Sequence, residues 1–171
     1  DGSITKVLKD HQTEVKQVEW SADGLRIASL DQSGQVVIWD ANTLNKQVQF
    51  DVHGQSSRYC RMEWKPDSKH LAFALSGAPA EVQVWDAVSG KQTQASKLTN
   101  ELAPKFMAWN KGAMRLALSF PKSNSDEPKI TVLGGRDFTM KIQTLRAGKE
   151  SLSPVAWSAD GKSIASGDNK G

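Results

Sequence analysis

Short runs that alternate apolar and polar residues follow one another through the first fifty residues. They read VKQVEW at 15–20, LRIASL at 25–30, VVIWD at 36–40 and KQVQF at 46–50. Turns rich in Gly, Ser and Asp, such as SADG and DQSG, separate the first three. Alternation with a period of two is typical of half-buried strands, and short polar turns join such strands in antiparallel pairs. The pattern therefore predicts four consecutive antiparallel strands.

The same four-strand pattern returns along the chain, and a tryptophan marks the end of each first strand. These residues are Trp20, Trp64, Trp109 and Trp157, at spacings of 44, 45 and 48 residues. The units that we expect are complete blades at 11–50, 52–96 and 98–145, a partial blade at 147–171, and the outer strand of a preceding or closing blade at 1–8. The third unit carries a polar, proline-flanked insertion at 121–128, which we expect to be a loop.

A four-stranded sheet of about 40 residues cannot bury both of its faces alone, but sheets stacked around an axis bury each other. We therefore predict an all-β fold, a β-propeller of four-stranded antiparallel blades. The segment would hold about three complete blades and partial blades at both ends. Because closed propellers usually have roughly four to eight blades, we expect this segment to be part of a larger propeller.

The composition narrows the class of protein only moderately. Charged residues make up 24% of the 171 residues and mean hydropathy is −0.50, so the composition favours neither a disordered chain nor an apolar membrane span. The single cysteine, Cys60, excludes an internal disulfide and fits a reducing compartment. No signal-peptide pattern stands at the start of the sequence. We therefore expect an intracellular protein, cytoplasmic or nuclear.

Several motifs resemble those of the WD40-repeat family, whose repeat length is similar. Trp39-Asp40 and Trp85-Asp86 resemble the dipeptide that gives the family its name. The WSADG sequences at 20–24 and 157–161 resemble its first hairpin turn. IASLDQSG and IASGDNKG resemble the strand and turn that precede the dipeptide. The resemblance covers nearly the whole chain and implies a propeller of WD40-type blades.

The WD40 resemblance also implies a polar tetrad that locks each blade, made of a His, a Ser or Thr, an Asp and the Trp. In the first unit His11, Ser29 and Trp39 occupy three of these positions. Ser33 stands at the position expected for the Asp, so we expect a partial tetrad.

The other units depart further from the tetrad pattern. In the second unit Trp85 is present, but Phe73 stands at the Ser position. The third unit has neither the His nor the Trp. The fourth has Ser166, with Lys170 at the Asp position. We expect packing to hold these blades together more than the polar tetrad does. The tryptophans are expected to pack between blades, and they are Trp20, Trp39, Trp64, Trp85, Trp109 and Trp157.

Candidate catalytic and ligand-binding groups are few. His11, His53 and His70 show no metal-ligand spacing, and Cys60 alternates along a strand as a small buried hydrophobe would. The sequence contains no Gly-x-Ser-x-Gly motif, and its glycine pairs lack the following helix of a phosphate loop. We therefore predict no catalytic, metal or cofactor site, and no enzymatic activity.

The resemblance implies a scaffold that mediates protein–protein interactions within a larger assembly. Its binding face would carry the loops that enter first strands and those that join second to third strands. The residues predicted on this face are Glu14, Lys16, Gln32, Arg58, Lys122, Asp126, Glu127, Ser151 and Asn169. Remaining blades would come from the same longer chain or from another copy.

An alternative function rests on charge alone. A net charge of +3 and a pI of about 9.0 would suit an RNA- or ribosome-associated propeller, such as a translation-related factor. However, the Lys and Arg residues are scattered, whereas a nucleic-acid-binding surface concentrates them.

Overall fold

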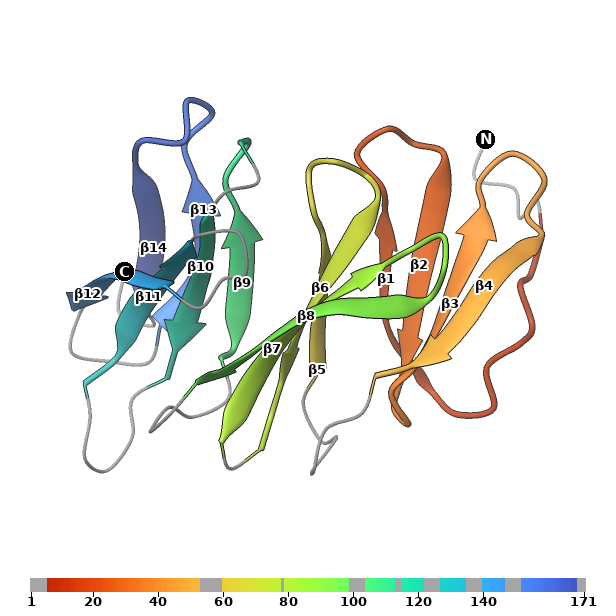
Figure 1. Ribbon diagram of the computed structural model, residues 1–171, viewed down its shortest axis with the longest axis horizontal. Helices are drawn as coiled ribbons and strands as arrows, with labels where there is room; N and C mark the ends of the chain where they lie inside the picture. Colours follow the sequence, from red (N-terminus) through yellow and green to blue (C-terminus); the bar gives the residue numbers. More distant parts are fainter. Residues whose placement is uncertain are drawn as a thin grey trace.

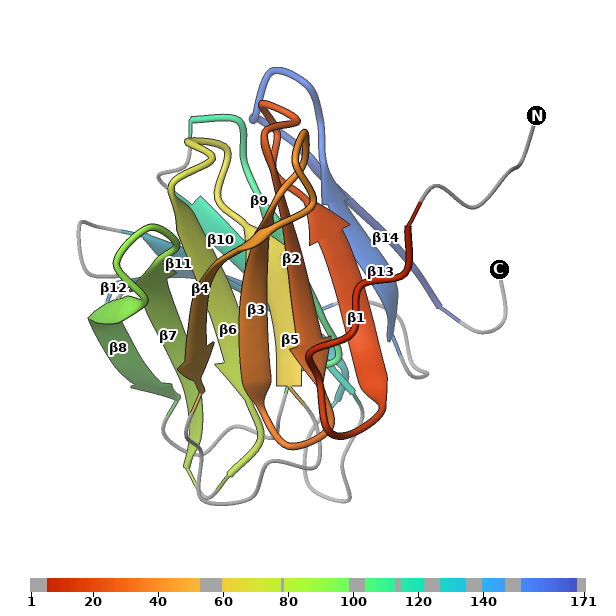
Figure 2. The same cartoon turned by 90° about the vertical axis from the view of Figure 1, so that its right-hand side faces the viewer.

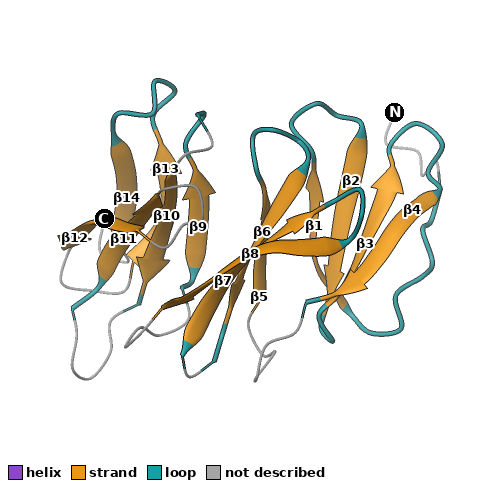
Figure 3. Ribbon diagram, viewed as in Figure 1, coloured by secondary structure: helices purple, strands orange, loops and turns teal. Residues whose placement is uncertain are grey.

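The computed structural model describes residues 6–52, 60–77, 79–98, 104–112, 115–121, 127–134, 140–146 and 152–168. The regular structure that it draws in these residues is β-strand (Figure 3). The strands in chain order are β1 (Val15–Trp20), β2 (Arg26–Asp31), β3 (Gln35–Asp40), β4 (Lys46–Asp51), β5 (Cys60–Trp64), β6 (His70–Leu75), β7 (Ala80–Asp86), β8 (Lys91–Leu98), β9 (Phe106–Trp109), β10 (Arg115–Phe120), β11 (Lys129–Gly134), β12 (Met140–Arg146), β13 (Leu152–Trp157) and β14 (Ile164–Asp168).

These strands form blades in sequence order. Blade 1 is β1–β4, blade 2 is β5–β8 and blade 3 is β9–β12, while β13 and β14 pair as the described part of blade 4. All neighbouring strands are antiparallel. The blades stand side by side in a fan, with blade 1 at one end and blade 4 at the other (Figure 1). The predicted all-β propeller class is confirmed.

Two local features repeat from blade to blade. The register between third and fourth strands shifts at Ile38/Trp39, Val84/Trp85 and Val132/Leu133, which places a bulge at the same point in three blades. The first turn ends in a left-handed residue, which is Gly24 in blade 1 and Gly161 in blade 4. In blade 2 this position is Ser68, at φ 57°, where a side chain is sterically costly.

The hydrophobic core lies between the blades. One buried cluster joins blades 1 and 2 through residues such as Leu30, Ile38 and Phe73, a second joins blades 2 and 3, and a third joins blade 3 to β13 and β14. A fourth, smaller cluster lies on the far face of blade 1, where Leu8 packs with Val37 and Trp39. Each sheet is thus stabilised by its neighbours, as stacked repeats require.

The ends of the chain differ in part from expectation. Residues 6–8 of the predicted outer strand 1–8 are not in a strand, and residues 1–5 lie outside the described part. At the other end, β13 and β14 form a two-stranded sheet. Of the insertion at 121–128, the described residues 121, 127 and 128 have no regular structure.

Candidate protein-binding site

First strands of successive blades are joined by side chains as well as by packing. The amide group of Gln17 on β1 donates to the Met62 carbonyl at 2.7 Å and accepts from the Met62 N–H at 3.0 Å. Because β5 is the edge strand of its sheet, its backbone groups need partners from outside the sheet. Gln17 therefore acts as a substitute for a neighbouring strand.

Two glutamates extend this pattern. Glu19 on β1 accepts a hydrogen bond from the Trp64 N–H at 3.4 Å, and Glu63 on β5 accepts one from the Trp109 N–H at 3.3 Å. The two residues occupy the same position in successive blades. Alternation alone would place such residues on the solvent face of a strand, whereas both side chains are half-buried between first strands.

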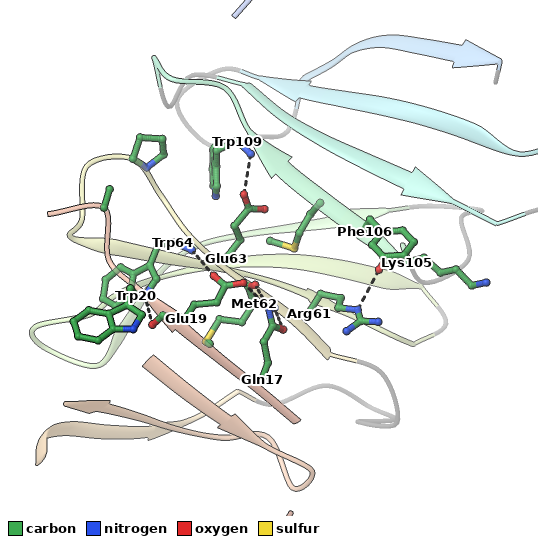
Figure 4. A pocket seen from close by; sticks show the side chains of 13 residues that line it. Gln17, Glu19, Trp20, Arg61, Met62, Glu63, Trp64, Lys105, Phe106 and Trp109 are labelled. Carbon is green, nitrogen blue, oxygen red and sulfur yellow. Dashed lines mark hydrogen bonds between the residues drawn. The ribbon is translucent and has the colours of Figure 1, made fainter. Parts of the chain in front are cut away.

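An open groove of about 540 Å³ runs along these first strands (Figure 4). Trp20, Met62, Glu63, Phe106 and Trp109 are among the side chains that line it. Aromatic and methionine side chains of this kind are enriched where proteins bind one another.

A basic cluster borders the same groove. The Arg61 guanidinium lies 5.9 Å from the centre of the Phe106 ring, and Nε of Arg61 donates to the Lys105 carbonyl at 3.1 Å (Figure 4). Nζ of Lys65 lies 5.8 Å from the centre of the Trp109 ring. These contacts hold cations over aromatic faces, where the quadrupole of the ring attracts them.

The environment of Glu63 shifts its ionisation strongly. Burial raises the pKa of Glu63 to about 8, the Trp109 N–H lowers it less, and the nearby Glu19 carboxylate raises it further. Burial also raises the pKa of Glu19, against the lowering effect of hydrogen bonds from Gln17 and Trp64. Glu63 is thus largely protonated at neutral pH in the folded chain.

This shift predicts that stability falls between pH 5 and pH 8. The folded chain keeps the Glu63 proton up to about pH 8, whereas the unfolded chain loses it near 4.5. Because the folded state then binds more protons, the free energy of unfolding should fall as pH rises, by roughly 2 kcal/mol across this window. Chemical denaturation at several pH values measures the fall. Glu63→Gln should flatten the profile, whereas Glu14→Gln, at an exposed position, should leave it unchanged. A wild-type profile that is flat or rises would contradict this assignment.

The polar tetrad of blade 1 is complete, which corrects the expectation of a partial one. The Trp39 indole N–H donates to Ser29 Oγ at 2.9 Å, and His11 Nε2 lies 2.6 Å from the same oxygen. His11 Nδ1 lies 3.2 Å from Oδ2 of Asp31. The acid is therefore Asp31, the last residue of β2, and not the residue at position 33.

Ser33 donates hydrogen bonds to the Asp31 carboxylate. Its backbone N–H and its hydroxyl both donate to Asp31 Oδ1, at 2.9 and 2.7 Å, and the Gln35 N–H donates at 3.0 Å. Burial by itself would raise the pKa of Asp31. Hydrogen bonds from Ser33, Thr13, Gln35 and His11 outweigh that effect and lower the pKa to about 2.

In blade 2 the indole N–H of the tryptophan has a different hydrogen-bond acceptor. Phe73 lies at the register position of Ser29 and is fully buried. The Trp85 indole N–H donates instead to Oε1 of Gln83 at 2.9 Å, a partner that sequence reasoning missed. The Trp85 ring also stacks on Phe50 of blade 1, with ring centres 4.9 Å apart.

The aspartates that follow Trp39 and Trp85 cap the next turn. Asp40 Oδ1 accepts from the N–H groups of Asn42 and Thr43, and Asp86 Oδ1 accepts from those of Val88 and Ser89. The Thr43 N–H is the main cause that lowers the pKa of Asp40, and the Ser89 N–H has the same role at Asp86. The Trp85-Asp86 dipeptide thus joins an inter-blade contact to a turn cap. Trp39, which was also expected to pack between blades, packs instead with Leu8 and Val37 on the far face of blade 1.

The four tryptophans at first-strand ends lie in different environments. Trp64 and Trp109 are buried, and Trp157 is half-buried. The Trp64 indole donates to the Glu19 carbonyl at 3.2 Å, and that of Trp157 to the Ala108 carbonyl at 2.9 Å. Trp20 differs from the packing expected for it, because it is 58% exposed within this chain.

Of the residues predicted on a binding face, three lie together at one end of blade 1. The Gln32 N–H donates to the Glu14 carbonyl at 2.9 Å, and Lys16 forms an ion pair with the Glu14 carboxylate. All three are exposed, as is Glu127 before β11. The predicted residues that lie outside the described part are Arg58, Lys122, Asp126, Ser151 and Asn169.

The residues considered for chemistry are dispersed. His11 belongs to the tetrad, His70 Nδ1 lies 2.9 Å from Asp67 Oδ2, and His53 falls outside the described residues. In the part that the structure describes, His, Cys, Asp and Glu do not form any group of three or more that could hold a metal ion. Among the same residues, no helix has the length and apolar character needed to cross a bilayer.

Comparison with known proteins agrees with this architecture. The family model described as "WD domain, G-beta repeat" matches residues 2–40. Cell division cycle 20.1, cofactor of APC complex, from Arabidopsis thaliana is 23% identical over 89% of this chain and 31% of its own length. THO complex subunit 3 from the same plant is 29% identical over 92% of this chain and 47% of its own length. Actin-interacting protein 1 from Drosophila melanogaster is 26% identical over 96% of this chain and 26% of its own length.

A crystal structure of the RRP9 WD40 repeats superposes with a TM-score of 0.70 and 17% sequence identity, over 88% of this chain and 44% of that one. The chain spans less than half the length of each of these proteins. The repeated blades, the tetrad of blade 1 and these similarities together show that the chain resembles WD40-repeat proteins and shares their blade architecture.

Proposed function

We propose that this chain is a non-catalytic scaffold for protein–protein interactions within a larger intracellular assembly. The names of two similar proteins, a cofactor of the APC complex and a THO complex subunit, refer to multiprotein complexes, and a third is called actin-interacting. A chain of related blades is well suited to the same kind of role.

The observation that carries the proposal is a rigid cluster of exposed polar side chains on blade 1. The backbone at Glu14 and Gln32 is fixed by their mutual hydrogen bond, and the Ser33 N–H also donates to Thr13 Oγ1 at 3.3 Å. The Glu14 and Lys16 side chains are 69% and 46% exposed, so their ion pair contributes little to stability. A partner could therefore use these groups while ordering little additional backbone.

The test is affinity capture with the full chain from extracts of its source cells, followed by quantitative mass spectrometry. In the variant Glu14→Arg/Gln32→Arg, we expect retention of the bound partner to fall about tenfold, as loss of a moderate interface contact would produce. Lys91→Glu, at an exposed position on β8, is the matched control and should retain the partner.

Two outcomes would contradict the proposal in this form. Equal losses in the variant and in the control would show that the blade 1 cluster is not the binding surface. Retention that disappears on RNase treatment and weakens steeply with salt would favour the RNA-associated alternative.

A further inference from the structure

The seam between the first strands of blades 1 and 2 contains a two-point hydrogen-bond contact. Gln17, three residues before Trp20, uses its side-chain amide to bond both the N–H and the C=O of Met62 on β5. Both groups point away from the sheet of blade 2, because β5 is its edge strand and Met62 lies in a pair that exchanges no ladder bonds. A primary amide thus fills both backbone groups of one edge residue.

The next seam, between blades 2 and 3, repeats the backbone arrangement. Met107 on β9 has the position of Met62, two residues before the tryptophan that ends its strand. The Trp109 N–H points out of the sheet, because it donates to Glu63 of blade 2. Every second residue of a strand directs its backbone groups to the same side, so the N–H and C=O of Met107 also point into the seam.

This second seam has no amide at the position of Gln17. Arg61 stands there, three residues before the tryptophan of blade 2. A guanidinium has donors only, so it cannot accept from the Met107 N–H, and Nε of Arg61 donates to the Lys105 carbonyl at 3.1 Å. In the part of the chain that the structure describes, no side chain bonds the backbone of Met107. We call its N–H and C=O the open amide site.

The surroundings of the open amide site limit what can fill it. Met107 is among the residues that line the groove along the first strands, so the site can be reached from outside. The outward groups on either side are already bonded. The Lys105 carbonyl accepts from Arg61, and the Trp109 N–H donates to Glu63. An extended peptide strand would have to break these bonds, whereas a single primary amide needs only the two groups of Met107.

The site lies between two four-stranded blades and not at an end of the fan. Figure 2 shows blade 1 in front of blades 2 and 3, and Figure 1 shows blade 4 on their other side. Both walls of the seam are therefore present, and the open groups are not the contact surface of another blade.

The charges at this end of the groove are mainly positive. Arg61 and Lys105 are both exposed. Glu63, the acid of the same seam, is largely protonated at neutral pH because burial raises its pKa to about 8, so it opposes them little. Complementary charge on a ligand would be negative.

We propose that the seam between blades 2 and 3 binds the side-chain amide of a glutamine in an acidic segment of a partner protein. The amide NH2 group donates to the Met107 carbonyl, and the amide oxygen accepts from the Met107 N–H, as Gln17 does at Met62. Acidic residues beside the glutamine pair with Arg61 and Lys105. The site is separate from the exposed polar cluster of blade 1, and either surface can fail its test without the other.

The experiment is an NMR titration of the full chain, with the Met107 N–H as the reporter. The probe is the peptide acetyl-Glu-Gln-Glu N-methylamide, whose only primary amide is that of the glutamine, and the control peptide carries leucine in its place. The glutamine peptide should shift the Met107 resonance in a saturable way, with a Kd of about 1 mM. The leucine peptide should bind about tenfold more weakly, because it leaves the site's polar groups unpaired.

Two variants at one position test the geometry of the site. Arg61→Gln should place an amide over Met107, which should slow hydrogen exchange of the Met107 N–H about tenfold and weaken binding of the glutamine peptide by a similar factor. Arg61→Leu removes the same charge but supplies no amide, so the Met107 N–H should exchange as fast as in the wild type. Circular dichroism checks that both variants fold, and the side chain of Arg61 is exposed.

Hydrogen exchange in the wild type gives a test that needs no variant. After correction for intrinsic rates, the Met62 N–H should exchange about tenfold more slowly than the Met107 N–H, because Gln17 bonds only the first. The proposal is overturned if the two amides exchange equally, if the leucine peptide binds as tightly as the glutamine peptide or neither binds, or if Arg61→Gln binds the glutamine peptide like the wild type.

Discussion

Phe73→Ala should destabilise the chain by about 3–5 kcal/mol, the cost of removing a buried phenylalanine and leaving a cavity. The side chain is fully buried in the cluster that joins blades 1 and 2. Its ring meets Phe50 edge-on, with centres 6.1 Å apart at 87°, and Phe50 in turn stacks on Trp85. Because both neighbours come from well-packed strands, the cavity cannot collapse easily. Guanidinium denaturation, monitored by tryptophan fluorescence, measures the loss.

Two further variants test the cavity explanation. Phe73→Leu keeps most of the volume and should cost far less than the alanine variant. Val88→Ala changes an exposed apolar residue and should have an effect within about 0.5 kcal/mol. A loss below about 1 kcal/mol for Phe73→Ala would show that the interface between blades 1 and 2 can repack, contrary to the close packing expected of a protein interior.

The position of Phe73 shows how much of the fold the sequence predicts. The repeat of the four-strand unit predicted β6, and the spacing of the tryptophans predicted where it lies in its blade. Both signals are local or strictly periodic, so a single sequence carries them. The same reasoning placed Phe73 at the Ser position of a tetrad. It could not show that Gln83 replaces that serine as the partner of Trp85, because the choice depends on side-chain reach across the sheet.

The first strands show a second limit. Gln17 and Glu19 alternate with apolar residues, as residues on a solvent face would. In the structure they complete the hydrogen bonds of the next blade's edge strand. Alternation reports only that one face differs from the other. It does not show which polar face contacts the backbone of another blade. The raised pKa of Glu63 could not be predicted for the same reason, because its main cause is burial of the side chain between first strands.

The tetrad acid was missed for a related reason. Counting along the turn led to position 33, whereas the carboxylate comes from Asp31, two residues earlier. Ser33 and Gln35 lie in the turn that follows Asp31, but His11 comes from the segment before β1, and alternation does not bring that segment to the turn. The signal that could have found it is the shared spacing of IASLD and IASGD, where Asp168 matches Asp31.

Asp31→Asn should therefore destabilise the chain by about 2–3 kcal/mol at pH 7, the size expected when an ionised, multiply hydrogen-bonded carboxylate is lost. An asparagine side chain keeps the shape but presents donors to the Ser33 and Gln35 N–H groups or to His11. The exposed fraction of the Asp31 side chain is 0%, so water cannot replace the lost partners. Denaturation of both chains at pH 7 measures the difference.

The pH dependence of that difference distinguishes charge from shape. Because the pKa of Asp31 is lowered to about 2 in the folded chain, its stabilisation is fully present above its unfolded value near 3.9. As pH falls from about 4 toward 2, the wild type should lose this contribution and approach the variant. Ser33→Ala removes one of several donors and should cost about 1 kcal/mol, less than Asp31→Asn. If Ser33→Ala proved the more damaging change, or if the gap between wild type and Asp31→Asn stayed constant down to pH 2, Asp31 would not be the acid that holds blade 1 to its entry segment.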